Sequence, residues 1–353
     1  MSEQVIEKYG INFEERAKQI LSTEPILAAK DLEVQFTLRG EKLNAIRKCS
    51  LELYDGETLA IVGESGSGKS VFTKCFVGML DKNGSITGGS ILYNGQDLTK
   101  FTTEKEWRTI RGGKIAMVTQ DPMTSLNPLK KIGVQIQEAI ELHQGMRGRE
   151  AKREAIHMLE LVGIPDPERR YNQYPHEFSG GMRQRVVIAI AVACRPQILI
   201  CDEPTTALDV TIQAQVLDLM TELKHEIGTS SIFITHDLGV ISEMADRVLI
   251  MYGGRVCEEA DVDELFTKPR HPYTVGLIDS HPNPEYDGDR LKVIPGSVPT
   301  LRDMPAGCPF NNRCAYASET CRDVFPDFEE AEGGHTVACH NWRQALQKGG
   351  AAR

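Results

Sequence analysis

The sequence has no long hydrophobic run and no recognisable targeting segment. Its longest apolar stretch, VVIAIAVAC at 186–194, has nine residues and is flanked by arginines. That is about half of what a membrane-spanning helix needs. The first twenty residues have neither the basic start nor the apolar core of a signal peptide. We therefore expect a cytosolic chain, in which any membrane role comes through partner proteins.

The sequence also has fewer basic than acidic residues. The 353 residues include 40 Lys and Arg against 50 Asp and Glu, which gives a net charge of −10. A general nucleic-acid binder usually carries the opposite sign, because phosphate neutralisation drives its affinity. We therefore expect no nucleic acid among the partners. The apolar fraction of 41% is ordinary for a soluble globular protein, and the length allows two domains.

Continuous apolar runs predict strands that are buried on both faces. The runs at 59–62, 198–201 and 231–235 are apolar at nearly every position, as in a parallel sheet. Helical stretches, for example at 69–80 and 212–227, separate these runs. The alternation indicates an α/β fold.

Composition divides the chain into three parts. We predict an N-terminal extension at 1–25, a main domain at 26–260 and a C-terminal domain at 261–353. A mostly helical subdomain is expected at about 121–185, where prolines and glycines interrupt the pattern. The pair Gly253–Gly254 predicts a hairpin turn, and a short helix at 261–267 follows it.

Residues 63–70, GESGSGKS, match the phosphate-loop motif G-x-x-x-x-G-K-[ST] between a predicted strand and a predicted helix. The glycines let the backbone curl with its N–H groups pointing inward, and the helix N-terminus favours anions. The strand and helix context disfavours a chance match in a glycine-rich turn. The motif predicts ATP binding, with Lys69 at the β- and γ-phosphates and Ser70 at Mg²⁺. The predicted nucleotide-binding residues of this loop are Gly63, Glu64, Ser65, Gly66, Ser67, Gly68, Lys69, Ser70 and Val71.

A second acidic motif follows the run QILICDE at 197–203. Asp202 is expected to hold Mg²⁺ through water, and Glu203 to polarise the attacking water as a general base. Two carboxylates at a strand end are common on protein surfaces, so this motif alone is weak evidence. Together with the phosphate loop it is strong evidence for a nucleotide site. His236, after the run SSIFITH, is a candidate contact to the γ-phosphate. Glu203, His236 and Lys69 are thus the predicted catalytic residues.

The stretch FSGGMRQ at 178–184 resembles the signature sequence LSGGQ of ATP-binding cassette (ABC) proteins. The resemblance covers about 26–260 and implies a P-loop, RecA-like ABC ATPase domain. It also implies that two ATPase subunits share each ATP site. Phe178 replaces the usual Leu, and Met182 replaces a Gln and so loses its amide hydrogen bonds. In this family the signature positions Ser179, Gly180 and Gly181 contact ATP. The resemblance also assigns Gln120 of VTQDP to ATP and to Mg²⁺, and Asp209 of the sequence Ala207–Leu208–Asp209 to ATP. His236 matches the switch histidine, and Phe36 is the candidate aromatic that stacks on adenine.

Two longer stretches and the C-terminal tail resemble the ATPase subunits of dipeptide and oligopeptide importers. The stretches are QDPMTSLNP at 120–128 and HPYTVGLIDSHP at 271–282, and the tail contains GCPFNNRC. The resemblance implies an ATP-hydrolysing motor subunit at the cytoplasmic face of the membrane. Its implied partners are a second, homologous ABC ATPase in a heterodimer, two transmembrane permease subunits and, indirectly, an extracytoplasmic peptide-binding protein.

Two alternative functions stay open at this point. Some close relatives of these ATPases import nickel or other small solutes, and the motifs do not separate the cargoes. The other alternative is a soluble ABC ATPase of DNA repair, translation or iron–sulfur assembly. The interval of about 110 residues between phosphate loop and signature has no sustained heptads of the DNA-repair type. Only one cassette is present, whereas translation types carry two.

Four cysteines lie near the C-terminus in the spacing C-x5-C-x6-C-x17-C, at Cys308, Cys314, Cys321 and Cys339. Structural disulfides are rare in the cytosol, and a redox sensor usually needs one low-pKa thiol with a resolving partner. Four thiolates can hold Zn²⁺, although no C-x2–4-C knuckle is present, or an iron–sulfur cluster. The importer resemblance implies a 4Fe–4S cluster, with zinc as the alternative, in a small cysteine-rich metal-binding domain.

We expect such a cluster to staple a tail that has too little apolar surface to fold alone; a redox role is the rival hypothesis. His335 and His340, which flank the last cysteine, are predicted at the surface. The single cysteines at 49, 75, 194, 201 and 257 are predicted to pack as small apolar residues.

Overall fold

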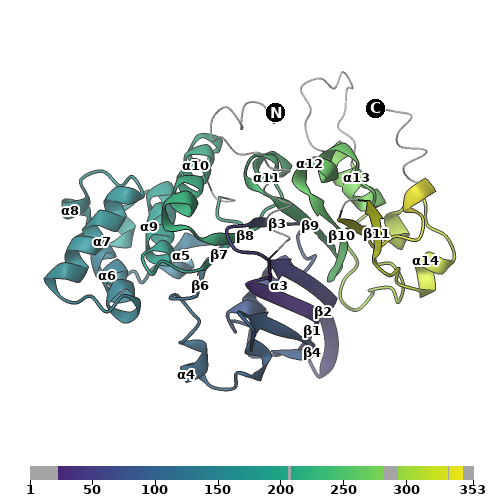
Figure 1. Cartoon of the computed structure of the whole chain (residues 1–353), viewed down its shortest axis with the longest axis horizontal. Coiled ribbons are helices and arrows are strands. Elements are labelled where there is room, and N and C mark those ends of the chain that lie inside the picture. The colour runs from purple at the N-terminus through teal and green to yellow at the C-terminus, as the bar shows by residue number, and fades with distance from the viewer. Residues whose placement is uncertain (1–22, 206–207, 281–292, 333, 345–353) are drawn as a thin grey trace. The chain divides into compact units, whose positions relative to one another are not determined.

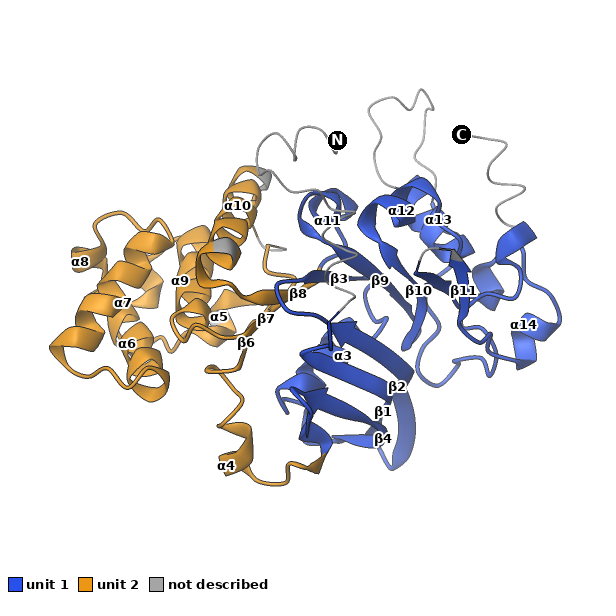
Figure 2. Ribbon diagram, viewed as in Figure 1, with its two compact units in different colours: residues 1–99, 235–353 blue, residues 100–234 orange. Residues whose placement is uncertain are grey.

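The computed structural model describes residues 23–205, 208–280, 293–332 and 334–344 (Figure 1). These residues form two compact units, one from 1–99 with 235–353 and the other from 100–234 (Figure 2). The N-terminal extension at 1–25 lies almost wholly outside the described residues. The domain boundaries at 26–260 and 261–353 stay predictions.

The first unit begins with an antiparallel sheet in the order β2-β1-β4-β5. Strand β1 pairs with both β2 and β4, and the short β5 pairs with β4. The strands of this sheet are β1 (Leu27–Leu38), β2 (Glu41–Leu53), β4 (Gly84–Tyr93) and β5 (Gln96–Asp97).

A second sheet in the first unit has both parallel and antiparallel pairs. Strand β3 (Thr58–Val62) pairs in parallel with β9 (Arg247–Tyr252), and every residue of both strands is buried. A hairpin at Gly253–Gly254, where both φ angles are positive, joins β9 to β10 (Arg255–Asp261). The predicted hairpin turn is thus confirmed. Strands β12 (His335–Val337) and β11 (Glu329–Glu332) continue this sheet beyond β10.

The helices of the first unit are short. The helix predicted at 69–80 ends at Phe76, because Gly78 takes a left-handed φ of 59° and its amide bonds back to the Cys75 carbonyl; such a residue closes a helix. The helices are α3 (Lys69–Phe76), α11 (Leu238–Met244), α12 (Val262–Thr267), α13 (Pro272–Asp279), η3 (Asn311–Arg313) and α14 (Thr320–Asp323).

The second unit contains a parallel sheet in the order β8-β7-β6. All residues of β7 and β8 are buried, which confirms the strands predicted from continuous apolar runs. The strands are β6 (Ile115–Val118), β7 (Ile198–Asp202) and β8 (Ser230–Ile234). The helices are α4 (Glu104–Trp107), α5 (Pro122–Ser125), α6 (Ile132–His143), α7 (Arg149–Leu161), α8 (Pro167–Arg170), η2 (Pro175–Glu177), α9 (Gly180–Val192) and α10 (Val210–Ile227). A further short helix, η1 (Leu98–Lys100), precedes α4 in the chain.

The cysteine-containing tail shares a hydrophobic core with the second sheet of the first unit. Cys308, Phe310 and Cys321 belong to the same buried cluster as Val62 of β3 and Tyr252 of β9. The tail therefore supplies part of this core, although its own sequence has few long apolar periods. The five single cysteines are all buried, as predicted.

One buried carboxylate, that of Glu258 on β10, connects the tail to the sheet. It accepts hydrogen bonds from the backbone amides of Arg270 (2.5 Å) and His271 (3.0 Å). Its Oε1 atom also lies 2.7 Å from Nε2 of His335 on β12. Arg270 Nε donates to Nδ1 of the same ring, so the proton of a neutral His335 is on Nε2. The prediction that His335 lies at the surface is therefore wrong: it is buried.

None of the helices in the described part of the chain is long and apolar enough to cross a membrane.

We expect Glu258→Gln to destabilise the tail by about 3 kcal/mol, because removing one partner of a buried charged network leaves the others unsatisfied. The change can be followed by guanidinium unfolding monitored through Trp342, which is buried in the tail, in a Trp107→Phe background. The matched control is Glu330→Gln on β11, where the side chain is exposed. Equal midpoints for the two variants would contradict this role of Glu258.

Candidate nucleotide site and cysteine pocket

The phosphate loop joins β3 to α3, and its glycines are required by close contacts and backbone angles. A Cβ atom at Gly63 would lie 2.2 Å from the carbonyl oxygen of Met251 and 2.8 Å from Ser67 Oγ. Gly66 and Gly68 have φ angles of 81° and 101°, which favour glycine. The loop shape therefore depends on the glycines that the motif contains.

Lys69 and Ser67 place polar groups inside this loop. The Lys69 ammonium is buried and donates to the carbonyl oxygens of Gly63 (2.7 Å) and Glu64 (3.1 Å). Ser67 Oγ is buried without a hydrogen-bond partner among the described residues. Ser65 and Gly66 are exposed at the tip, while Ser70 and Val71 begin α3. A cation, a hydroxyl and a helix N-terminus thus converge on one loop, as an anion site requires.

The second unit brings Gln120 and Glu203 together. Gln120 follows β6, Glu203 follows β7, and these strands are parallel neighbours, so both side chains lie at the same sheet edge. Gln120 Nε2 donates to Glu203 Oε2 over 3.0 Å. Glu203 has a φ of 47°, which is uncommon outside glycine and is concentrated at functional sites. Its amide donates to the Ile234 carbonyl, and the neighbouring Asp202 is buried.

The signature residues form the start of α9. Ser179 is its N-cap, and its Oγ accepts a hydrogen bond from the amide of Met182. A Cβ at Gly180 would meet nothing within 4 Å, whereas one at Gly181 would lie 2.7 Å from Ile212 Cγ2 on α10. Phe178 is buried, so the departure from Leu at this position keeps an apolar residue in the core.

Three other predicted nucleotide contacts have these local surroundings. Asp209 is exposed and caps α10, because its Oδ1 accepts from the Ile212 amide at 3.0 Å. His236 is exposed in the segment after β8. Phe36 is half-buried on β1 and covers Gly84, whose added Cβ would lie 2.7 Å from the ring. Ala207 lies outside the described residues. Contact of these residues with nucleotide stays a prediction.

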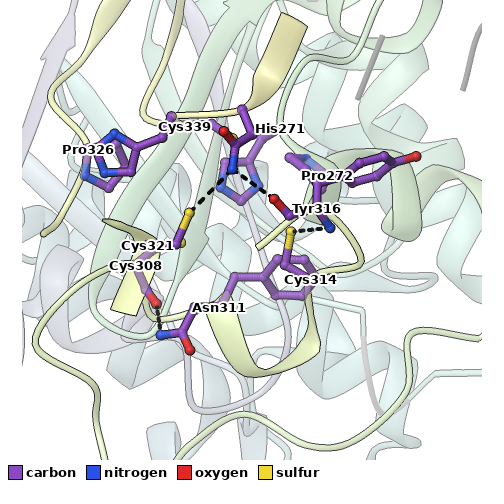
Figure 3. Close-up of a pocket in the computed structure, with 12 residues that line it drawn as sticks. His271, Pro272, Cys308, Asn311, Cys314, Tyr316, Cys321, Pro326 and Cys339 are labelled. Carbon is purple, nitrogen blue, oxygen red and sulfur yellow. Dashed lines mark hydrogen bonds between the residues drawn. The ribbon is translucent and has the colours of Figure 1, made fainter. Parts of the chain in front are cut away.

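The four C-terminal cysteines line a single hollow (Figure 3). Cys308 and Cys321 are buried, and Cys314 and Cys339 are half-buried. In the described ranges, no group of three or more His, Cys, Asp or Glu side chains is arranged to hold a metal ion. The four cysteines thus share one pocket, but nothing in the described residues supports the predicted metal-binding domain, which stays a prediction.

Polar groups in this pocket are directed at the sulfur atoms. The backbone amide of Tyr316 donates to Cys314 Sγ at 3.4 Å (Figure 3). The side-chain amide of Asn341 donates to Cys321 Sγ at 3.6 Å. Burial, with a smaller contribution from neighbouring thiols, raises the pKa of both Cys308 and Cys339 to about 12. These two thiols are therefore protonated at neutral pH unless a cationic partner stabilises their thiolates.

Two residues that the motif analysis left without a role contact the phosphate loop. The Glu64 amide donates to the hydroxyl of Tyr273 at 2.8 Å. Arg313 Nη1 lies 2.9 and 3.0 Å from the two carboxylate oxygens of Glu64. Both residues occur inside stretches that were already singled out, HPYT and CPFNNRC. Only the folded chain brings them to the loop.

Comparison with known proteins supports the reading of both regions. The ABC transporter family profile matches residues 46–206, and that of the oligopeptide/dipeptide transporter C-terminal region matches 257–321. The chain is 54% identical to the oligopeptide transport ATP-binding protein AmiE of Streptococcus pneumoniae serotype 4, over 90% of this chain and 88% of that protein. It is 48% identical to the dipeptide transport ATP-binding protein DppD of Bacillus subtilis, over 91% and 95% respectively.

A solved structure also resembles this chain. It is a dimeric ATP-binding cassette in a post-hydrolysis state, bound to ADP and Pi. It aligns with a TM-score of 0.60 at 28% identity and covers 67% of this chain and 98% of that one. The likeness supports the P-loop ATPase fold.

We expect Gly63→Ala to reduce ATP affinity at least about tenfold, because the added Cβ meets a backbone carbonyl that cannot retreat as a side chain can. Binding can be measured with a fluorescent ATP analogue on the full chain. Gly88→Ala on β4 is the matched control, since its added Cβ would meet only the flexible side chain of Glu33, with Oε2 at 3.0 Å. Wild-type affinity in folded Gly63→Ala protein would contradict this account of the loop.

Proposed function

Because this chain belongs to the ABC transporter family, among the ATP-binding subunits of its oligopeptide and dipeptide transporters, we propose that it drives the import of dipeptides or oligopeptides. The chain is an ATPase of this family. The peptide cargo rests on the names of its relatives. The single observation that carries the proposal is the match of both regions, cassette and C-terminal region, at about half identity along nearly the whole chain.

We assign the steps of ATP hydrolysis to residues of the nucleotide motifs. Lys69 and the amides at the start of α3 bind phosphate oxygens, and Glu203 takes a proton from the attacking water. Gln120, hydrogen-bonded to Glu203, orients that carboxylate. Ser70, Gln120 and Asp202 supply the oxygen ligands that Mg²⁺ prefers, and the metal neutralises phosphate charge when bound. His236 is assigned to the γ-phosphate.

The signature residues are assigned to the nucleotide of a second subunit. Ser179 and Gly180 are exposed at the start of α9, where no side chain of the described residues crowds Gly180. An exposed helix N-terminus with a hydroxyl cap can bind a phosphate of another subunit. We therefore infer that a monomer hydrolyses ATP poorly and that closure of an ATPase pair completes each site.

The remaining partners follow from this role. We propose a heterodimer with a homologous ATPase, docked on two transmembrane permease subunits at the cytoplasmic face of the membrane. An extracytoplasmic protein would deliver the peptide, so the peptide never contacts this chain. Nickel or another small solute as cargo, and a soluble ABC ATPase without a transporter, receive less support, since the matched relatives are oligopeptide and dipeptide transport proteins.

We expect Glu203→Gln to lower the ATPase rate of the assembled importer at least about 100-fold, because a general base is lost. ATP binding should persist, and uptake of a labelled dipeptide or tripeptide by cells should stop. Glu222→Gln, an exposed change on α10, serves as the control. Unchanged peptide uptake in a strain in which the Glu203→Gln variant replaces the wild-type chain would contradict the proposed function.

We further propose that the four-cysteine pocket holds a 4Fe–4S cluster. The donor set fits: four thiols surround one hollow, and N–H donors point at two of the sulfurs, as cluster ligands usually have. A cubane spaces its four ligands more widely than a single zinc ion, whose ligands lie at about 2.3 Å. When bound, the cluster would supply four iron atoms that hold the thiolates together.

His271 gives a second indication of fit. Its Nδ1 accepts from the Tyr273 amide, and burial lowers its pKa to about 4, so the neutral ring has its proton on Nε2. That atom is buried without a partner among the described residues, and the ring lines the cysteine pocket. An anionic cluster or its thiolates would satisfy such a donor. The cluster's role is assigned to stapling the tail, with redox sensing as the rival.

Anaerobically purified protein should contain about four irons per chain and show a broad absorption band near about 400 nm that dithionite bleaches. One zinc and no colour would leave the ATPase intact but refute the cluster. Compared with the cluster-loaded wild type, the double variant Cys314→Ser with Cys321→Ser should have a tail that is sensitive to protease. A protease-resistant tail in that double variant would refute the staple role. Replacement of the buried Cys201 by Ala controls for general thiol loss.

A further inference from the structure

We propose that Arg313 and Tyr273 are positioning residues for ATP, because they hold Glu64 of the phosphate loop and so make nucleotide affinity depend on the fold of the C-terminal tail. This goes beyond the proposed import function. It depends neither on the identity of the cargo nor on the presence of a cluster, since every contact involved is between side chains and backbone of this chain.

All three guanidinium nitrogens of Arg313 make hydrogen bonds, which fix the side chain beside Glu64. Nη1 contacts both carboxylate oxygens of Glu64 and the Tyr252 hydroxyl at 3.1 Å. Nε and Nη2 donate to the carbonyl oxygens of Pro295 and Ile294. Its side chain is 6% exposed, against 30% for Glu64. A guanidinium fixed on several sides gives a stronger and more rigid pair than an exposed lysine would.

Tyr273 fixes the main chain of the same loop residue. Its hydroxyl accepts from the Glu64 amide, and its ring is fully buried in contact with Tyr252 and Phe310, at centroid distances of 4.7 and 5.3 Å. The amide of Glu64 is therefore held by an aromatic cluster, while the Glu64 carbonyl accepts from Lys69. Side chain, amide and carbonyl of one loop residue are all fixed, which sets the path of the loop.

Charge gives this arrangement a consequence for ATP. Glu64 is the second residue of the phosphate loop, and an unpaired carboxylate there would repel the triphosphate. Arg313 neutralises that carboxylate from the side of the tail. Arg313 also lies directly before Cys314 and at the end of η3, so the segment 308–314 lines the cysteine pocket and reaches the loop. Disorder in the pocket would thus release the loop.

The experiment is a double-mutant cycle on the full chain with ATP binding as the readout. We expect Arg313→Gln to weaken binding about 5- to 10-fold, as loss of a charged hydrogen bond implies. Adding Glu64→Gln should restore much of this loss, because the repelling charge is removed. Arg313→Lys should be intermediate, and Tyr273→Phe, which removes only the hydroxyl, should weaken binding about 3-fold.

A merely structural role would give another pattern. In that case Glu64→Gln would not rescue Arg313→Gln, and the two effects would add independently. Wild-type affinity in Arg313→Gln would also overturn the proposal. Arg302→Gln is the matched control: Arg302 pairs with Glu41 at 2.8 Å, but both side chains are about half exposed, so no change in binding is expected. In the assembled importer, Arg313→Gln should raise the KM for ATP more than it lowers kcat, the rate at saturating ATP.

Linkage gives an independent readout. If the tail promotes ATP binding, ATP must stabilise the tail by the same factor. Saturating ATP should therefore slow protease cleavage between 308 and 321 in the wild type and in Arg302→Gln, and much less in Arg313→Gln. Equal protection in all three proteins would refute the coupling even if affinities differ.

Discussion

The C-terminal half of the first unit depends on a single buried carboxylate. The Glu258 carboxylate is hydrogen-bonded to the backbone amides of Arg270 and His271 and to the ring of His335. These groups come from different segments of the chain. A buried charge without such donors would be strongly destabilising. The position of β12 and the start of α13 follow from the need to satisfy it. Because Tyr273 lies in the first turn of α13, the same carboxylate helps to place the hydroxyl that contacts the phosphate loop.

This arrangement explains why a tail of low apolar content can fold. Phe310, Cys308 and Cys321 add to a core that β3, β9 and β10 already provide, so the tail does not need a core of its own. Conversely, the aromatic cluster of Tyr252, Tyr273 and Phe310 supports the loop on the side away from solvent. The phosphate loop and the tail are thus parts of the same compact unit, which gives the tail a route by which it can influence nucleotide binding.

Both local sequence motifs and tertiary packing determine the positions of the predicted nucleotide-binding residues. Gly63 is required by the Met251 carbonyl and Gly181 by the Ile212 side chain, and both belong to motifs that are legible in the sequence. The contact between Gln120 and Glu203 follows from their places after two parallel strands. By contrast, Phe178 and Met182 depart from the family motif, and only the structure reveals that Phe178 remains in the core.

The sequence by itself determined the α/β class, the buried parallel strands, the phosphate loop and the family, because these depend on local patterns and short motifs. It also identified four cysteines as a group. It did not predict that His335 is buried, since its partner Glu258 is 77 residues away. It gave no role to Arg313, whose contact with Glu64 spans 249 residues. Such pairs leave no periodic or local signal; they arise only when sheet pairing and core packing bring distant charges into one desolvated place.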